Sequence, residues 1–245
     1  MRQADRIRRA VLSNNITPEL SPDVLRQGFL ETADLVIAVD QLSREPQDPL
    51  WKEKLKMAIG GQGLPQQEGE ESPARDIQFE LTIAAMCRVA GLSVTLAEPD
   101  VVVTGMPFRF GVAAKRLKSF GSLEQHIRKA RRQIVGAGLD GIIALDISSS
   151  VHQENRTIFE TDAHRLTAWT EAAAGRFVDH YSPRIMRWLR ERRVFGVAVY
   201  CKALVCTREG RYGTARRWSV FNTCPQTDIR YEHLRMFAAR MASIQ

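Results

Sequence analysis

Three residues between positions 80 and 115 carry side chains suited to phosphodiester chemistry. Glu80 lies in the helix-like stretch ARDIQFELTIAAMCRVAG, Asp100 follows Pro99 at the start of a β-branched run, and Lys115 ends the strand-like run FRFGVAAK. Carboxylate oxygens are the ligands that Mg²⁺ prefers, and a divalent cation can activate water and neutralise charge on a transferring phosphate. A lysine beside such acids can stabilise the phosphate. These residues predict a site for Mg²⁺- or Mn²⁺-dependent phosphodiester hydrolysis, with Glu80 and Asp100 as metal ligands.

The surrounding residues predict the helices and strands that would hold this set in place. The β-branched run Val101–Val103 and the apolar run GIIALDI, bounded by Gly and Ser, are typical of buried strands. Along the chain, the expected elements are a helix over 74–91, strands over 92–97, 99–105 and 107–115, a helix over 121–137 and a strand over 139–147. This α-β-β-β-α-β order predicts an α/β fold in which a mixed sheet has a helix on each face.

The order of an acid on a helix, an acid on one strand and a lysine on the next resembles the PD-(D/E)xK, or restriction-endonuclease-like, nuclease superfamily. The resemblance covers residues 74–148, and Glu98-Pro99-Asp100 supplies the Pro-Asp pair. It implies the αβββαβ core of that superfamily and a metal-dependent nuclease that uses Glu80, Asp100 and Lys115. It also implies a place near the site for Gln133, on the second helix, and biology in DNA repair, mobile elements or defence.

One position departs from the superfamily pattern, because the acid expected two residues before Lys115 is Ala113. Residues 113 and 115 of a strand share a face, so Ala113 occupies the place of the missing carboxylate. Three explanations stay open. Glu98, if its strand is unbroken, or Asp76, one turn earlier on the first helix, supplies the acid. Alternatively, two acids suffice together with waters and a substrate phosphate, or the site is degenerate.

Two classes of function follow. The first is a metal-dependent nuclease that hydrolyses phosphodiester bonds in nucleic acid, with DNA as the expected substrate. The alternative is a catalytically degenerate nuclease-fold protein that binds nucleic acid or acts as a subunit of a larger assembly, and Ala113 is the residue that favours it. A lysine buried beside acids is costly to keep without a role. Because of Lys115, we favour the nuclease over the protein that only binds nucleic acid.

The charge of the chain favours a polyanionic partner. Its 245 residues carry a formal net charge of +7, and each phosphate that Lys or Arg neutralises releases condensed counterions. In the helix over 121–137, Ser122 is the expected N-cap, and apolar residues at helical spacing should face the sheet: Leu123, Ile127, Ala130 and Ile134. The expected phosphate contacts are Lys118, Arg128, Lys129, Arg131 and Arg132. A second basic region runs from Arg184 to Arg193, with Trp188 expected as a core anchor.

The chain divides into three expected parts. Residues 1–59 predict an N-terminal helical region, residues 60–73 a flexible linker rich in Gly, Pro, Gln and Glu, and residues 74–245 the nuclease-like α/β domain, whose extension over 149–245 should lengthen and cover the sheet. No apolar run is long enough for a membrane span, and the N-terminus lacks the features of a signal peptide. We expect a cytoplasmic protein with buried free cysteines, and leave open a homodimer or larger assembly.

Overall fold

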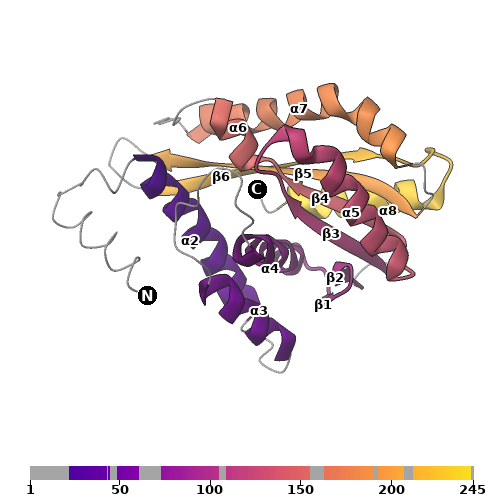
Figure 1. Ribbon diagram of the computed structural model, residues 1–245, viewed down its shortest axis with the longest axis horizontal. Helices are drawn as coiled ribbons and strands as arrows, with labels where there is room; N and C mark the ends of the chain where they lie inside the picture. Colours follow the sequence, from indigo (N-terminus) through magenta and orange to yellow (C-terminus); the bar gives the residue numbers. More distant parts are fainter. Residues whose placement is uncertain are drawn as a thin grey trace.

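A six-stranded mixed sheet forms the centre of the computed structural model (Figure 1). The structure describes residues 22–42, 44, 49–60, 73–104, 109–154, 163–189, 193–206 and 212–243. The strands are β1 (Val94–Ala97), β2 (Asp100–Val103), β3 (Phe110–Arg116), β4 (Gly141–Asp146), β5 (Val194–Cys206) and β6 (Tyr212–Asn222). They lie side by side in chain order, and β3, β4 and β5 run parallel while the other neighbours are antiparallel.

Helices cover both faces of the sheet, because the parallel strands are joined by crossovers and need a buried surface on each side. One face is covered by α5 (Leu123–Gly136), α6 (Ser148–Glu154) and α7 (Ala163–Trp188), and the other by α2 (Pro22–Leu42), α4 (Pro73–Val89) and α8 (Ile229–Ala242) (Figure 1). Helix α3 (Pro49–Gly60) packs on α4, and a short 3₁₀ helix, η1 (Phe120–Ser122), precedes α5. Each face has its own apolar core. The predicted α/β architecture is confirmed at this level.

Most element boundaries agree with the sequence-based expectation to within a few residues. Helices α2 and α3 lie in the N-terminal region that was expected to be helical, and strands β5 and β6 lengthen the sheet as expected. Ser122 does occupy the N-cap of α5, but its hydroxyl donates to the carbonyl of Ser119 and makes no capping hydrogen bond. The expected linker falls almost wholly outside the described residues.

Ion pairs attach α2 to the carboxyl ends of the parallel strands. Arg116 on β3 lies 3.5 Å from Asp146 on β4 and 3.4 Å from Glu31 on α2. Lys202 on β5 pairs with Asp34, one turn further along α2. All five residues are buried, and losing one partner of a buried pair leaves an uncompensated charge. These contacts therefore fix the position of α2 over the sheet, next to the strand end that holds Lys115.

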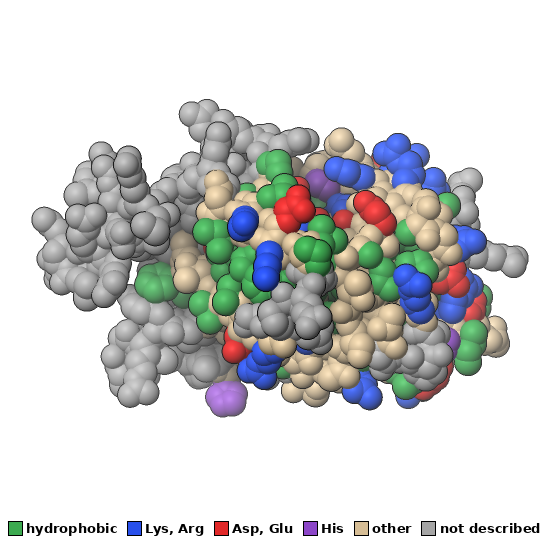
Figure 2. Space-filling view, turned by 90° about the horizontal axis from the view of Figure 1, so that it is seen from below, with side chains coloured by type: hydrophobic (Ala, Val, Ile, Leu, Met, Phe, Trp, Pro, Cys, Tyr) green, Lys and Arg blue, Asp and Glu red, His purple; other side chains and the backbone are tan. Residues whose placement is uncertain are grey.

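The opposite side of the molecule from α7 has a mixed surface. Viewed from the side of α3 and β1, basic and acidic side chains are interspersed with apolar ones (Figure 2). Within the described ranges, none of the helices combines the length and the hydropathy needed to cross a membrane.

Candidate functional site

Asp100 is the centre of a cluster of polar side chains at the start of β2. Its Oδ2 atom accepts hydrogen bonds from Lys115 Nζ at 3.0 Å and from the backbone N–H of Ala114 at 2.8 Å. Its Oδ1 atom accepts from Gln133 Nε2 at 3.2 Å. The side chains of Asp100 and Lys115 are only 8% and 10% exposed. The structure therefore brings together three of the four residues expected at the site, in a largely buried setting.

The strand pairing explains why these residues meet. A two-residue turn, Glu98-Pro99, joins β1 to β2, so Asp100 is the first residue of β2. Strands β2 and β3 pair antiparallel with Val101 opposite Val112. One step further in this register, Asp100 lies opposite Ala113. Residues 113 and 115 point to the same face of strand β3, so Lys115 lies on the face of Ala113. Because β2 runs antiparallel to β3, its start meets the carboxyl end of β3, the end at which α/β sheets commonly bind ligands.

Glu80 reaches the same region from helix α4. Its carboxylate forms an ion pair with Lys54 of α3 at 2.5 Å, and both side chains are mostly buried. Burial raises the pKa of the Glu80 carboxyl, and the negative charge of Asp100 raises it further, while Lys54 opposes the rise. The charges of the two carboxylates therefore act on each other, although the direct contact of Glu80 is with Lys54. Two like charges held close together are the arrangement that a bound cation stabilises.

A group of cations surrounds Asp76, one turn before Glu80 on α4. Loss of surrounding water raises the pKa of the Asp76 carboxyl, although the residue is exposed, and four positive charges oppose the rise. These charges belong to Arg116, Lys115, Lys118 and Lys129. Nζ of Lys118 is buried and has no hydrogen-bond partner among the described residues. The charges of Lys118 and Lys129, two residues expected to contact phosphate, thus act on the Asp76 carboxylate.

The structure narrows the explanations for the missing acid. Ala113 is completely buried and packs in the apolar core beneath α5 and α7. Glu98 is exposed and lies in the turn between β1 and β2. It therefore does not share an unbroken strand with Asp100, as it would have to in order to supply the acid. Asp76 remains the candidate for a further acid, since it lies on the same helix as Glu80, and burial raises its pKa while the charge of Lys115 partly opposes that rise.

The oxygen atoms in this cluster suit a hard divalent cation. Mg²⁺ is commonly held by one or two carboxylates, completed by waters and substrate phosphates. Asp100 and Glu80 supply two carboxylates, and the buried side-chain oxygen of Gln133 has no hydrogen-bond partner among the described residues. Within those residues, no three His, Cys, Asp or Glu side chains form a group that could hold a metal alone. The donor set therefore fits a cation that shares its coordination with water or phosphate.

Helix α5 divides the basic residues between two flanks. Leu123, Ile127, Ala130 and Ile134 are buried, as predicted, and define its inner face. Lys129 lies one turn before Gln133 and so shares the flank that meets Asp100, whereas Arg128 and Arg131 lie on the opposite flank. Arg132 is exposed on the outer side. The five residues expected to contact phosphate therefore do not form one surface.

The second basic region meets α5 at this far flank. Arg128 and Arg131 line a pocket of about 450 Å³ together with Arg187 and Trp188 of α7. Trp188 is partly buried against the core, in keeping with the expected anchor, but it also forms a wall of this pocket. Sequence reading missed this pocket, and it also missed Lys54 at Glu80. Both depend on helix packing between distant segments, for which the sequence holds no local signal.

Comparisons with protein-family models, with curated proteins and with solved structures each returned no match to this chain.

Proposed function

We propose that this protein is a metal-dependent nuclease of the restriction-endonuclease-like kind, acting at the cluster around Asp100. The observation that carries the proposal is the contact among Asp100, Lys115 and Gln133, and the charge of Asp100 also acts on the Glu80 carboxylate of α4. Residues far apart in the sequence, on two strands and two helices, contribute to one buried polar group. If the Asp100–Lys115 pair were purely structural, it would need neither the second carboxylate, Glu80, nor a buried Gln133 oxygen without a hydrogen-bond partner among the described residues.

Each side chain has a task that follows from its position. Asp100 and Glu80 would hold a Mg²⁺ or Mn²⁺ ion, which supplies an activated water and neutralises charge on the phosphate when bound. Gln133 and the backbone N–H of Ala114 orient the Asp100 carboxylate by hydrogen bonds. Lys115, already a donor to Asp100 at 3.0 Å, would donate to a phosphate oxygen brought beside that carboxylate. Lys118 and Lys129 would attract the backbone of the substrate.

A cleavage assay tests this proposal directly. Purified protein is incubated with labelled single-stranded and double-stranded DNA and RNA, in Mg²⁺, in Mn²⁺ or in chelator. We expect metal-dependent cleavage that Asp100→Asn and Lys115→Met abolish, because each variant removes a group from the reacting centre. Asp40→Asn, an exposed acid on α2, is the matched control and should cut like the wild type. Equal cleavage by Asp100→Asn would show that the site is assigned to the wrong residues.

Ala113 favours a second candidate, a nucleic-acid-binding protein without catalysis. The position opposite Asp100 is apolar and fully buried, so the second strand acid of the superfamily is replaced by packing. Calorimetric titration with Mn²⁺ separates the two candidates, since no heat at millimolar metal would support this one. Ala113→Glu is the complementary variant. Cleavage gained by this variant would show that the rest of the site is in place for chemistry.

A further inference from the structure

Helix α7 carries a row of basic side chains along one side. Arg176, His180, Arg184 and Arg187 follow one another at spacings of four, four and three residues, which places them on one side of a helix. All four are exposed. Neither Arg176, Arg184 nor Arg187 forms an ion pair with a carboxylate among the described residues. Arginines that form no ion pair are available for an external anion, which their planar guanidinium groups bind through paired hydrogen bonds.

Two pockets lie along this row. At its far end, Arg187 and Trp188 share the 450 Å³ pocket with Arg128 and Arg131 of α5. At its near end, a larger cavity of about 650 Å³ is bounded by α7, by Val151 of α6 and by η1. That volume lies within the range of small-molecule binding sites. The row of basic side chains therefore runs from one pocket to the other on the surface formed by α5, α7 and η1.

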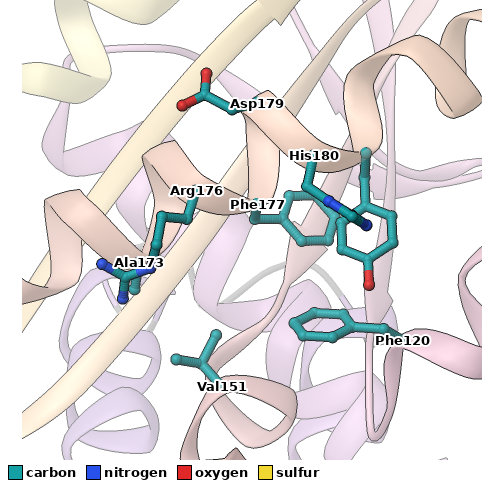
Figure 3. Close-up of a pocket in the computed structure, with 8 residues that line it drawn as sticks. Phe120, Val151, Ala173, Arg176, Phe177, Asp179 and His180 are labelled. Atoms are coloured by element: carbon teal, nitrogen blue, oxygen red, sulfur yellow. The ribbon is translucent and has the colours of Figure 1, made fainter.

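Aromatic rings line the larger cavity. In Figure 3 the ring of Phe120 lies on one side, Phe177 and His180 lie on the other, and Asp179 points away from the rings. The ring centre of Tyr181 is 5.2 Å from that of Phe120 and 5.0 Å from that of Phe177. Phe120 and Tyr181 pack against each other and are only partly buried, so part of this ring cluster is exposed to the cavity that it lines. Exposed aromatic rings stack on the bases of single strands with little regard to sequence.

We propose that the α7 row and the aromatic cavity together bind a single strand of nucleic acid. The arginines contact successive phosphates, and an unpaired base enters the cavity and stacks on Phe120 and Tyr181. The row from Arg176 to Arg187 rises about 16 Å along the helix, the length of a few nucleotides. A duplex fits this arrangement poorly, because its bases are already stacked and paired. The inference rests on the proposed function and specifies the form of its substrate.

The cavity lies close enough to Asp100 to serve the same strand. Phe120 follows Lys115 by five residues, so the chain between them spans at most about 17 Å. Lys118, whose Nζ is buried without a hydrogen-bond partner among the described residues, lies between Lys115 and Phe120 in the sequence. A strand with one base in the cavity thus reaches the Asp100 cluster within a few nucleotides.

Binding measured without metal tests the arginine row separately from cleavage. A labelled oligothymidylate is titrated by fluorescence anisotropy in chelator, at several salt concentrations. The charge of the row is removed with Arg176→Gln/Arg184→Gln/Arg187→Gln. The control triple removes the same charge from exposed positions elsewhere, with Lys52→Gln/Lys56→Gln/Arg235→Gln. Each phosphate contact adds about 0.7 to the salt slope of a single strand. A fourfold rise in salt should therefore cost the wild type about 18-fold more affinity than it costs the row variant.

The cavity is tested with Tyr181→Leu, which keeps an apolar side chain and removes the stacking face. We expect this variant to bind the oligothymidylate about tenfold more weakly. An abasic strand should bind the wild type and Tyr181→Leu equally, because there is no base to stack. His180→Ala, at the exposed rim, gives a second variant that leaves the core packing intact. Circular dichroism and the melting temperature establish that each variant is folded.

The outcomes separate this inference from the proposed function. Binding that depends on the row and on Tyr181, without cleavage in any metal, would support the single-strand surface and count against the nuclease. Metal-dependent cleavage by a protein that binds duplex as tightly as single strand, with no effect of Tyr181→Leu or of the row variant, would overturn the inference and leave the nuclease standing. An equal effect of the two triple variants would also overturn it, since net charge alone would then explain binding.

Discussion

Replacing Lys115 by Met should destabilise the protein by about 3 kcal/mol, because it leaves Asp100 buried without its cation. Breaking a buried ion pair costs about 3–5 kcal/mol. Asp100 keeps two hydrogen bonds in the variant, from the Ala114 N–H and from Gln133, which places the cost at the low end. At about 2–4 °C per kcal/mol for a chain of this size, the melting temperature should fall by about 6–12 °C.

A double-mutant cycle gives the coupling within this pair. Asp100→Asn should cost about 2 kcal/mol, because the Lys115 ammonium keeps its hydrogen bond to the Ala114 carbonyl but loses its counter-charge. In the double variant neither charge remains to be compensated. We therefore expect its cost to be smaller than the sum of the single costs by about 2 kcal/mol, within the range observed for residues in contact.

Urea denaturation of the four proteins, followed by tryptophan fluorescence and circular dichroism, measures these free energies of unfolding. Additive costs, agreeing within about 0.5 kcal/mol, would refute the reasoning, because they would mean that water screens the two charges from each other. A double variant almost as stable as the wild type but unable to cut would show that chemistry, and not stability, requires the pair. Added Mn²⁺ should raise the melting temperature of the wild type and of Lys115→Met, but not that of Asp100→Asn.

Three further predictions concern other positions. Gly141→Ala should be severely destabilising in a thermal melt, because the new Cβ would lie 2.4 Å from the carbonyl oxygen of Gly111, whereas Gly136→Ala, with open space in helix α5, should stabilise by about 1 kcal/mol. Asp228, which caps α8, has its pKa lowered to about 2, chiefly by a hydrogen bond from an arginine side chain. Because the folded-state pKa is lowered, the charged Asp228 stabilises the protein at pH values above its unfolded pKa of about 3.9, and this stabilisation is lost on acidification. Asp228→Ala should therefore cost about 1 kcal/mol near neutral pH. The difference in free energy of unfolding between variant and wild type, measured in urea melts, should shrink as the pH falls from about 4 towards 2. Burial raises the pKa of Glu80, so this carboxyl must lose its proton before a metal binds to it. The Mn²⁺ affinity measured by calorimetry should therefore still rise with pH above the usual glutamate range. An identical pH profile of Mn²⁺ affinity in Glu80→Gln would contradict this prediction.

Local patterns in the sequence were sufficient to predict the central elements. Strand β4 follows from the run GIIALDI, and α5 follows from apolar residues at helical spacing, all four of which are buried. These patterns succeed because burial on a regular helix or strand imposes a fixed period on the side chains. The same reasoning placed Ser122 correctly at the N-cap of α5 but did not predict its hydrogen bond, which goes to the carbonyl of Ser119. One hydroxyl has several local partners of similar energy.

The meeting of Asp100, Lys115 and Gln133 was implied by the resemblance to the nuclease superfamily, and the contacts are present in the structure. Order along the chain was informative here because adjacent antiparallel strands and the crossover helix after them have few ways to pack. The same reasoning could not decide between Glu98 and Asp76. That choice depended on where β1 ends and on which way α4 faces, and both are properties of the packed sheet.

Contacts between distant helices were decided by the tertiary structure alone. Lys54 meets Glu80 because α3 packs on α4, and Arg187 meets Arg131 because the end of α7 lies beside α5. Exposed basic residues carry no periodic signal that identifies their partners, since a solvated arginine and a phosphate-binding arginine have the same sequence context. The sequence thus determined the residue types that could bind a metal and a polyanion. Packing of the two helical layers determined which of them share a surface, because only a three-dimensional arrangement sets the distances on which electrostatic and stacking interactions depend.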